Sequence, residues 1–226
     1  MTRATRVGIF GGTFNPIHLG HLRAAEEVRE ALDLERVIFV PAAQPPHKSG
    51  SGDDPIAPAT ERLRWVRAAV EGQPGFEVDS LEVDRGGRSY SVDTLREIGA
   101  RTAPELPVFA LGCDAFAELG TWRQPQVLFS LAHFAVMTRP PVTRGSLAEW
   151  LPKCVRDDVE VSADGLSGRH RVAATWIRLL PILALDISSS DIRARIRAGR
   201  SVRFLVPEAV REAVERNPLY AGGDAR

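Results

Sequence analysis

A glycine-rich turn between a short apolar run and a helical segment is the feature of this sequence that most restricts its fold. Residues 6–10 predict a short buried strand, residues 11–16 read Gly-Gly-Thr-Phe-Asn-Pro, and residues 19–32 have the apolar spacing of a helix. A second run rich in β-branched residues follows at 36–40. This order predicts a right-handed βαβ unit. We therefore expect an α/β fold with a mostly parallel sheet and helices on both faces.

The rest of the chain alternates helices with strands. Periodicity and end signals predict helices from a cap at Thr60 to just before Gly72, at 91–98, at 127–131, from Ser188 to about residue 198, and from Pro207 to about residue 216. Strands are predicted at 76–83, 108–111 and 133–137. Five prolines and two glycines make residues 41–59 a surface loop, and we expect residues 139–171 to be mostly irregular.

Size and charge limit the classes of protein to consider. With 226 residues, 44% of them hydrophobic, the chain can bury one core, so we expect a single domain over 1–226 with an ordered core at about 5–220. The 29 basic residues balance the 29 acidic ones, which argues against nucleic acid or a membrane as a partner. A homo-oligomer stays open.

The cysteines and the apolar runs indicate a cytoplasmic protein. Cys113 and Cys154 lie far apart and outside any C-x-x-C pattern, which disfavours a disulfide framework or a structural zinc site. No apolar stretch approaches the roughly 18 residues of a membrane span, and the chain does not begin with a signal peptide pattern.

The glycine turn has the properties of a phosphate site. Gly11 and Gly12 lack a Cβ, so backbone N–H groups can approach a phosphate, and the following helix adds its positive end. His18 and His21 are three residues apart at the start of that helix and can both point at the bound anion. A lone histidine there is more often a buried residue bonded to a carbonyl, but two on one face favour a functional site.

Other anion and metal sites fit the glycine turn less well. It lacks both the dehydrogenase fingerprint and the P-loop pattern. The cysteine spacing supplies no pair of zinc ligands, so we expect no metal held by the protein itself.

A serine-rich turn near the C-terminus offers a second anion site. Ser188, Ser189 and Ser190 place three hydroxyls and backbone N–H groups at a helix start, and Arg193 follows at the end of the first turn. This set suits a triphosphate. The alternative is an ordinary serine cap with a solvated Arg193, which would be favoured if the serine turn stood alone.

Two phosphate sites without a paired-carboxylate, Ser-His-Asp or Cys-His constellation indicate a reaction with no covalent intermediate and no strong base. A phosphate monoester attacking a phosphoanhydride fits, because its second pKa of about 6 leaves it mostly ionised at neutral pH. The protein need only align it and stabilise charge on the α-phosphate and the leaving pyrophosphate. Cationic His18 and His21, Arg193 and a Mg²⁺ ion carried by the ATP phosphates would do this.

Together the two turns form a double signature, G-G-T-F-x-P-x-H-x-G-H with I-S-S-S-x-I-R, that resembles the nucleotidyltransferase superfamily. Over nearly its whole length the chain most resembles bacterial nicotinate-mononucleotide adenylyltransferases. The motifs behind this choice are P-A-A-Q-P-P-H-K at 41–48, R-S-Y-S-V-D-T-L at 88–95, G-C-D at 112–114 with Trp122, and F-L-V-P at 204–207. The resemblance implies a Rossmann-like nucleotidyltransferase fold. It also implies transfer of AMP from ATP to nicotinate mononucleotide, giving deamido-NAD and pyrophosphate in NAD biosynthesis.

The resemblance further implies roles for individual residues. The catalytic set would be His18, His21 and Arg193, and the ATP-binding set Gly11, Gly12, Thr13, Phe14, Gly20, Ser188, Ser189 and Ser190. In the substrate site, Lys48 would reach phosphates, Asp114 a ribose, Trp122 would stack on the pyridine ring, and Ser91 would join them. Without the resemblance, Trp122 could equally be a core aromatic and Lys48 an exposed loop charge.

The sequence also departs from the pattern and leaves rivals open. Asn15 stands where many relatives have Asp, Pro141 stands where they commonly have Gly, and residues 142–174 form a longer segment than expected. A sister enzyme, pantetheine-phosphate adenylyltransferase, is disfavoured by His47, Lys48 and Trp122. A non-catalytic nucleotide sensor is disfavoured by the intact histidines and Arg193. An aminoacyl-tRNA synthetase core shares H-x-G-H, but this chain is short and neutral.

Overall fold

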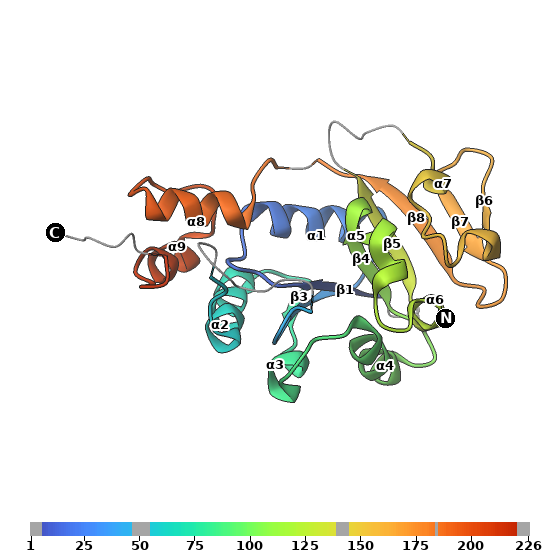
Figure 1. Cartoon of the computed structure of the whole chain (residues 1–226), viewed down its shortest axis with the longest axis horizontal. Coiled ribbons are helices and arrows are strands. Elements are labelled where there is room, and N and C mark those ends of the chain that lie inside the picture. Colours follow the sequence, from blue (N-terminus) through green and yellow to red (C-terminus); the bar gives the residue numbers. More distant parts are fainter. Residues whose placement is uncertain (1–5, 47–54, 139–144, 184, 221–226) are drawn as a thin grey trace. The chain divides into compact units, whose positions relative to one another are not determined.

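The computed structural model describes residues 6–46, 55–138, 145–183 and 185–220 (Figure 1). The strands in this part of the chain are β1 (Val7–Gly12), β2 (Arg36–Pro41), β3 (Phe76–Val78), β4 (Val108–Gly112), β5 (His133–Thr138), β6 (Val159–Val161), β7 (Ser167–His170) and β8 (Trp176–Pro181). They form one sheet in the order β3-β2-β1-β4-β5-β8-β7-β6. The pairs β1–β4, β4–β5 and β5–β8 are parallel, whereas β8–β7 and β7–β6 are antiparallel. The predicted α/β class with a mostly parallel sheet is confirmed.

The helices connect and cover these strands. They are α1 (Leu19–Ala31), α2 (Ala59–Val70), α3 (Leu81–Arg85), α4 (Ser91–Thr102), α5 (Cys113–Ala117), α6 (Pro125–Leu131), α7 (Leu147–Trp150), α8 (Ser189–Arg197) and α9 (Glu208–Glu215), with 3₁₀ turns η1 (Glu118–Thr121) and η2 (Arg156–Asp158). None of the helices in the described ranges is long and apolar enough to span a membrane.

The chain divides into two compact units, each built from three separate segments. The sheet unit comprises Met1–Gly11, Ala24–Ile38 and Tyr90–Ala184, and the motif unit comprises Gly12–Arg23, Phe39–Ser89 and Leu185–Arg226. The single domain over 1–226 stays a prediction.

In the sheet unit, apolar parallel strands are covered on both sides. Phe109 of β4 lies opposite Ile9 of β1 and Phe134 of β5. Phe134 stacks on Phe129 of α6 with ring centroids 4.6 Å apart. Helix α1 covers one face and α4 and α6 the other (Figure 1). Strands that are buried on both faces need such covering helices, which explains their nearly continuous apolar sequence.

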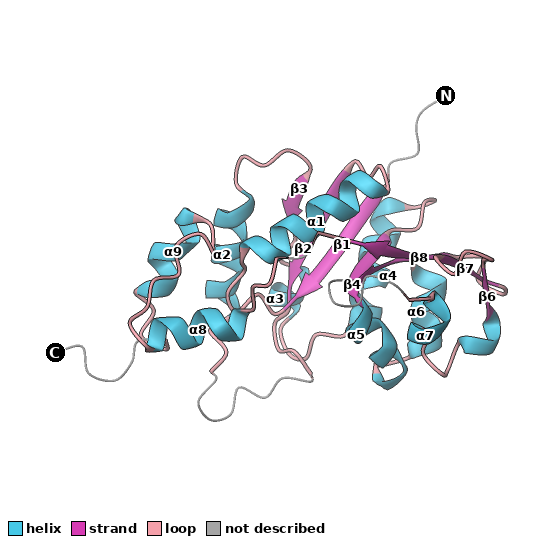
Figure 2. Cartoon of the chain, turned by 90° about the horizontal axis from the view of Figure 1, so that it is seen from above, coloured by secondary structure: helices cyan, strands magenta, loops and turns pink. Residues whose placement is uncertain are grey.

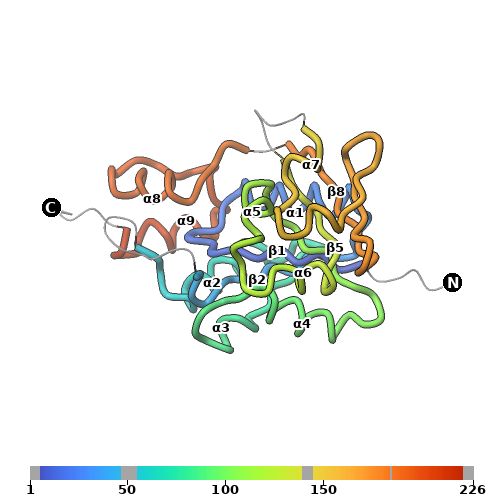
Figure 3. Tube along the Cα trace, turned by 45° about the vertical axis from the view of Figure 1, so that its right-hand side comes forward, coloured from blue at the N-terminus to red at the C-terminus, as the bar shows by residue number. Residues whose placement is uncertain are grey.

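The sheet unit also contains short helices, α5, η1 and α7, that contact one another or adjoining segments. Helix α5 follows β4 directly and packs against α7 (Figure 3). The Cβ that Gly120 lacks would lie 3.6 Å from Sγ of Cys154, so η1 also contacts the segment after α7.

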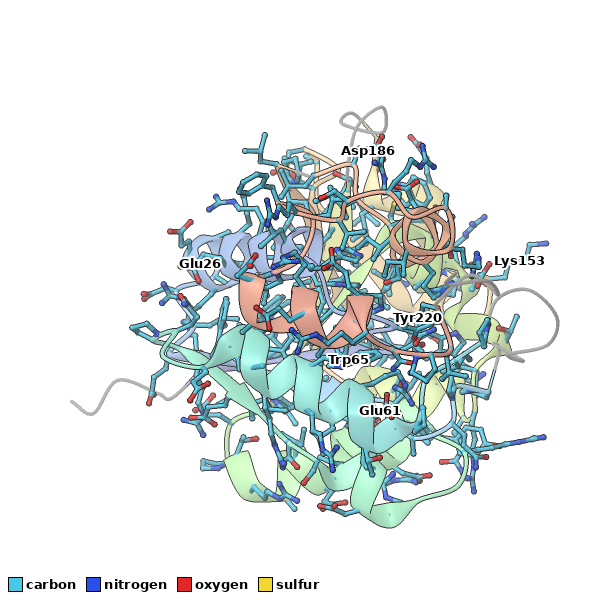
Figure 4. The ribbon with its side chains drawn as sticks, turned by 90° about the vertical axis from the view of Figure 1, so that its left-hand side faces the viewer. Glu26, Glu61, Trp65, Lys153, Asp186 and Tyr220 are labelled. Atoms are coloured by element: carbon cyan, nitrogen blue, oxygen red, sulfur yellow. The ribbon has the colours of Figure 1, made fainter. Side chains whose placement is uncertain are left out.

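In the motif unit, helices α2 and α9 pack together (Figure 2). The rings of Trp65 on α2 and Tyr220 after α9 lie 6.1 Å apart (Figure 4). Nearby, Nδ2 of Asn217 donates a hydrogen bond of 2.6 Å to the carboxylate of Glu61. The last described residues are therefore anchored on α2.

The strand predicted at 76–83 is wrong in its second half. β3 ends at Val78, and α3 begins at Leu81. The carboxylate of Asp79 accepts the backbone N–H of Leu81 at 2.9 Å, and the hydroxyl of Ser80 donates to Asp84 at 2.6 Å. These local hydrogen bonds compete with the strand and start a helix, although the apolar alternation continues.

The irregular region predicted at 139–171 is also wrong where the structure describes it. It contains α7 and the antiparallel pair β6–β7. The hairpin turn closes between Ser162 and Gly165, whose φ is 72°. Strands of three and four residues are too short to show periodicity in the sequence.

Two helix starts are displaced from the prediction. Pro58, not Thr60, precedes α2, because the carbonyl of Pro58 already accepts the N–H groups of Glu61 and Arg62. Pro207 is the cap of α9 rather than its first residue. The prediction for α8 is confirmed: Ser188 is its cap, and Gly199 follows it with a φ of 63°.

Candidate active site

The glycine turn folds around a buried phenylalanine. Phe14 has a φ of 49°, in the left-handed region, and is 2% exposed. A Cβ on Gly12 would lie 2.9 Å from the Phe14 ring, so this position has room only for glycine. The Phe14 ring meets His21 edge-on at a centroid distance of 5.2 Å. The side chain of Phe14 therefore supports a histidine, while its backbone shapes the turn.

The two histidines hydrogen-bond to each other's backbone. Nδ1 of His21 accepts the backbone N–H of His18 at 3.2 Å, and Nδ1 of His18 accepts that of His21 at 3.3 Å. The rings stack with centroids 3.6 Å apart. Because a neutral imidazole has one donor and one acceptor nitrogen, both rings carry their hydrogen on Nε2 in this arrangement. The pair can thus offer two Nε2–H donors to an anion.

Gly20 has a steric role beside this pair. A Cβ at position 20 would lie 3.0 Å from Nδ1 of His18 and 3.5 Å from the carbonyl oxygen of Leu185. Because Gly20 has no side chain, the His18 ring and the backbone of Leu185 can both lie close to it.

The serine turn lies directly against the glycine turn. The hydroxyl of Ser188 accepts the N–H of Asp191 at 3.0 Å and caps α8. The hydroxyl of Ser189 donates to the carbonyl of Pro16 at 2.9 Å. Nη1 of Arg193 donates to the carbonyl of Asn15 at 2.5 Å. Two segments more than 170 residues apart in the sequence are thus joined within the motif unit (Figure 2).

Arg193 is not the solvated arginine of the alternative interpretation. It is 5% exposed, and its Nη2 donates to the hydroxyl of Ser190 at 3.0 Å. The motif at 204–207 also reaches this region, because the carbonyl of Leu205 accepts the N–H of Leu19, the first residue of α1, at 2.9 Å.

Arg62 is a residue of this region that the motifs did not single out. It is 1% exposed and donates to three carbonyls: Ala57 at 2.9 Å, Thr13 at 2.6 Å and Ala43 at 2.9 Å. Burial lowers the pKa of Arg62 to about 10, so it is charged at neutral pH. It ties the glycine turn to both ends of the loop after β2. Its place on the apolar side of α2 was the only signal for it in the sequence.

Three of the residues expected in the substrate site belong to the sheet unit rather than to the motif unit. Lys48 and His47 lie outside the described residues. Ser91 is the first residue of α4, Asp114 is exposed on α5, and Trp122 follows η1, all three in the sheet unit. Trp122 is half-buried and meets Phe109 edge-on at 6.4 Å, so it is not enclosed as a core aromatic would be.

The segment after Trp122 is joined to the start of α4. Arg123 lies over the ring of Tyr90 at 4.7 Å and pairs with Asp93 at 3.5 Å. Arg96 donates to Gln124 at 2.7 Å. These contacts join residues 90–96 to residues 123 and 124, which directly follow Trp122.

The described residues contain no group of three or more His, Cys, Asp or Glu side chains that could hold a metal ion. Mg²⁺ prefers six oxygen ligands in octahedral geometry.

Sequence comparison identifies relatives across the whole chain. Residues 9–195 match the model of the family described as cytidylyltransferase-like. A protein of Citrifermentans bemidjiense named "Probable nicotinate-nucleotide adenylyltransferase" is 45% identical over 222 residues, which cover 98% of this chain and 100% of that protein. A protein of Methylococcus capsulatus with the same name is 42% identical, with coverages of 95% and 99%.

Structural comparison agrees on the fold. The nicotinic acid mononucleotide adenylyltransferase of Plasmodium falciparum, solved in complex with NaAD, superposes with a TM-score of 0.67 at 16% identity, covering 95% of this chain and 97% of that one. The Rossmann-like fold of nucleotidyltransferases is thereby confirmed.

Proposed function

Because this chain belongs to the nicotinate-nucleotide adenylyltransferases of the cytidylyltransferase-like family, we propose that it transfers AMP from ATP to nicotinate mononucleotide. The products are deamido-NAD and pyrophosphate, in the biosynthesis of NAD. The protein is an enzyme, a nucleotidyltransferase that uses ATP.

The observation that best supports this reaction is the contact between the glycine and serine turns. Ser189 bonds to Pro16, and Arg193 bonds to Asn15, so both helix starts belong to one compact region. A helix start offers backbone N–H groups and a positive end to an anion. Two such starts with paired histidines suit a triphosphate better than a single phosphate.

In the proposed step, an oxygen of the nicotinate mononucleotide phosphate attacks the α-phosphorus of ATP. The new P–O bond forms as the bond between the α-phosphorus and the bridging oxygen breaks, and pyrophosphate leaves with the bonding electrons. Nε2–H donors of His18 and His21 would stabilise charge on the α-phosphate. Serine hydroxyls and N–H groups at the start of α8 would hold the β and γ phosphates. No proton has to leave the nucleophile, because its phosphate is already ionised.

ATP would bind as its magnesium complex, in which the ion neutralises phosphate charge. Lys48, Ser91, Asp114 and Trp122 would bind nicotinate mononucleotide. A cytoplasmic location is supported by Cys113 and Cys154, which form no disulfide.

A comparison of acceptors tests the function. Purified protein with magnesium and ATP should release pyrophosphate fastest with nicotinate mononucleotide, when nicotinamide mononucleotide and phosphopantetheine are offered in parallel. His18→Ala should lose most of this rate, on the order of 100-fold or more, at a temperature where the variant is still folded. Release with phosphopantetheine alone would reassign the enzyme, and no release with any acceptor would favour a nucleotide sensor.

A further inference from the structure

A buried polar cluster lies behind the glycine and serine turns of the motif unit. Asn15 is 4% exposed, and Tyr220, the last described residue, is 0% exposed. The hydroxyl of Tyr220 donates to Oδ1 of Asn15. The same oxygen accepts the N–H of Ala57 at 3.0 Å, while Nδ2 of Asn15 donates to the carbonyl of Pro55 at 3.0 Å. Both ends of the Asn15 amide are therefore fixed.

The backbone of Asn15 is part of the contact between the two turns. Its carbonyl accepts the hydrogen bond from Arg193, and the next carbonyl, that of Pro16, accepts the one from Ser189. His18 follows two residues later. A displacement of Asn15 would therefore reach the arginine, the serine turn and the histidine pair together.

Tyr220 is well placed to hold Asn15. Its ring packs on Trp65 of α2, 6.1 Å between centroids (Figure 4). Burial raises the pKa of Tyr220 to about 12, so the hydroxyl remains protonated and can donate at neutral pH. An unmade hydrogen bond at such a buried site costs more than one at the surface.

We propose that Tyr220 is a positioning residue for adenylyl transfer: its hydroxyl holds Asn15, and thereby the backbone segment that accepts the Arg193 hydrogen bond and leads to His18. This inference rests on the proposed function. The competing explanation is that Tyr220 only fastens the C-terminal segment to α2 and contributes to stability alone.

The test compares one variant that removes the Tyr220 hydrogen bond with one that alters the Tyr220 ring contact. Tyr220→Phe keeps the ring and removes only the hydroxyl, whereas Trp65→Phe loosens the packing on that ring and keeps the hydroxyl. Steady-state rates with ATP and nicotinate mononucleotide are measured at a temperature below all melting transitions. Tyr220→Phe should lower kcat about three- to tenfold, the effect of one buried hydrogen bond felt in the transition state, and change both KM values less than kcat. Trp65→Phe should melt earlier but keep kcat within about twofold.

Two further variants, Asn15→Ala and its combination with Tyr220→Phe, show whether the loss of kcat depends on Asn15. In an Asn15→Ala background, the further change Tyr220→Phe should leave kcat unchanged, because its partner is gone. If Asn15→Ala does not fold, the comparison of Tyr220→Phe with Trp65→Phe decides alone.

Each outcome has one meaning. An active wild type whose kcat is unchanged by Tyr220→Phe, or reduced equally by Trp65→Phe, would overturn the positioning role and leave the proposed function standing. An inactive wild type would overturn the proposed function, and the positioning role with it.

Discussion

At the scale of single residues, His18 and His21 show how local hydrogen bonds set the chemistry of a side chain. Both Nδ1 atoms accept backbone N–H groups, which leaves Nε2 as the donor of each ring. The H-x-G-H spacing predicted two side chains on one face but not which nitrogen would face an anion.

Two amide substitutions at position 18 separate the roles of the ring nitrogens. Glutamine places its NH₂ group near the position of Nε2, and asparagine places its amide near that of Nδ1. If Nε2–H of His18 stabilises the transition state, His18→Gln should keep kcat within about tenfold of wild type, and His18→Asn should lose roughly 100-fold. Single-turnover rates on folded proteins measure this. Equal losses would show that the Nε2 donor has no special part.

At the scale of elements, Ser188 caps α8 and is also proposed to bind phosphate, and one substitution distinguishes these two roles. Aspartate caps a helix as well as serine does, so Ser188→Asp should keep the melting temperature. Its negative charge beside the bound phosphates should raise KM for ATP about tenfold or more.

Ser188→Ala is the matched control for this prediction. It removes the hydroxyl that accepts the N–H of Asp191 and should cost about 1 kcal/mol of stability. An aspartate variant with normal KM for ATP would mean that triphosphate does not approach this cap.

The elements that the sequence predicted well are those with strong end signals. Helix α8 has a serine cap and a following glycine, and the turn before α1 has two glycines and a proline. The sequence did not predict β6 and β7, because these strands are short. It did not predict α3, because hydrogen bonds of Asp79 and Ser80 start a helix within a segment whose apolar alternation is typical of a strand. Arg62 could not be recognised, because its three acceptors are backbone carbonyls from three segments and leave no trace in side-chain identity.

At the scale of the whole molecule, the stability of the fold should depend on pH through His133. Burial, aided by Arg178 and Arg6, lowers the pKa of His133 to about 4, and its ring stacks on Trp176 at 4.5 Å. The unfolded chain would bind this proton near the ordinary value of 6.5. Neutral His133 therefore makes its full contribution to the free energy of unfolding above pH 6.5, and this contribution is lost as the pH falls towards 4.

Urea unfolding at several pH values measures this dependence. The free energy of unfolding of the wild type should fall by about 1 to 2 kcal/mol more than that of His133→Phe between neutral and acid pH, allowing for partial exposure of the ring. Phenylalanine keeps a stacked ring but cannot titrate. Parallel curves for the two proteins would exclude His133 as the source.

In the proposed enzyme, the glycine and serine turns together hold one triphosphate. The most direct measurement is a crystal structure of the protein with magnesium and a non-hydrolysable ATP analogue. We expect a single triphosphate to accept hydrogen bonds from Nε2 of His18 or His21 and, through its outer phosphates, from the Ser188–Ser190 start of α8. A triphosphate that contacts only one of the two turns would contradict this expectation.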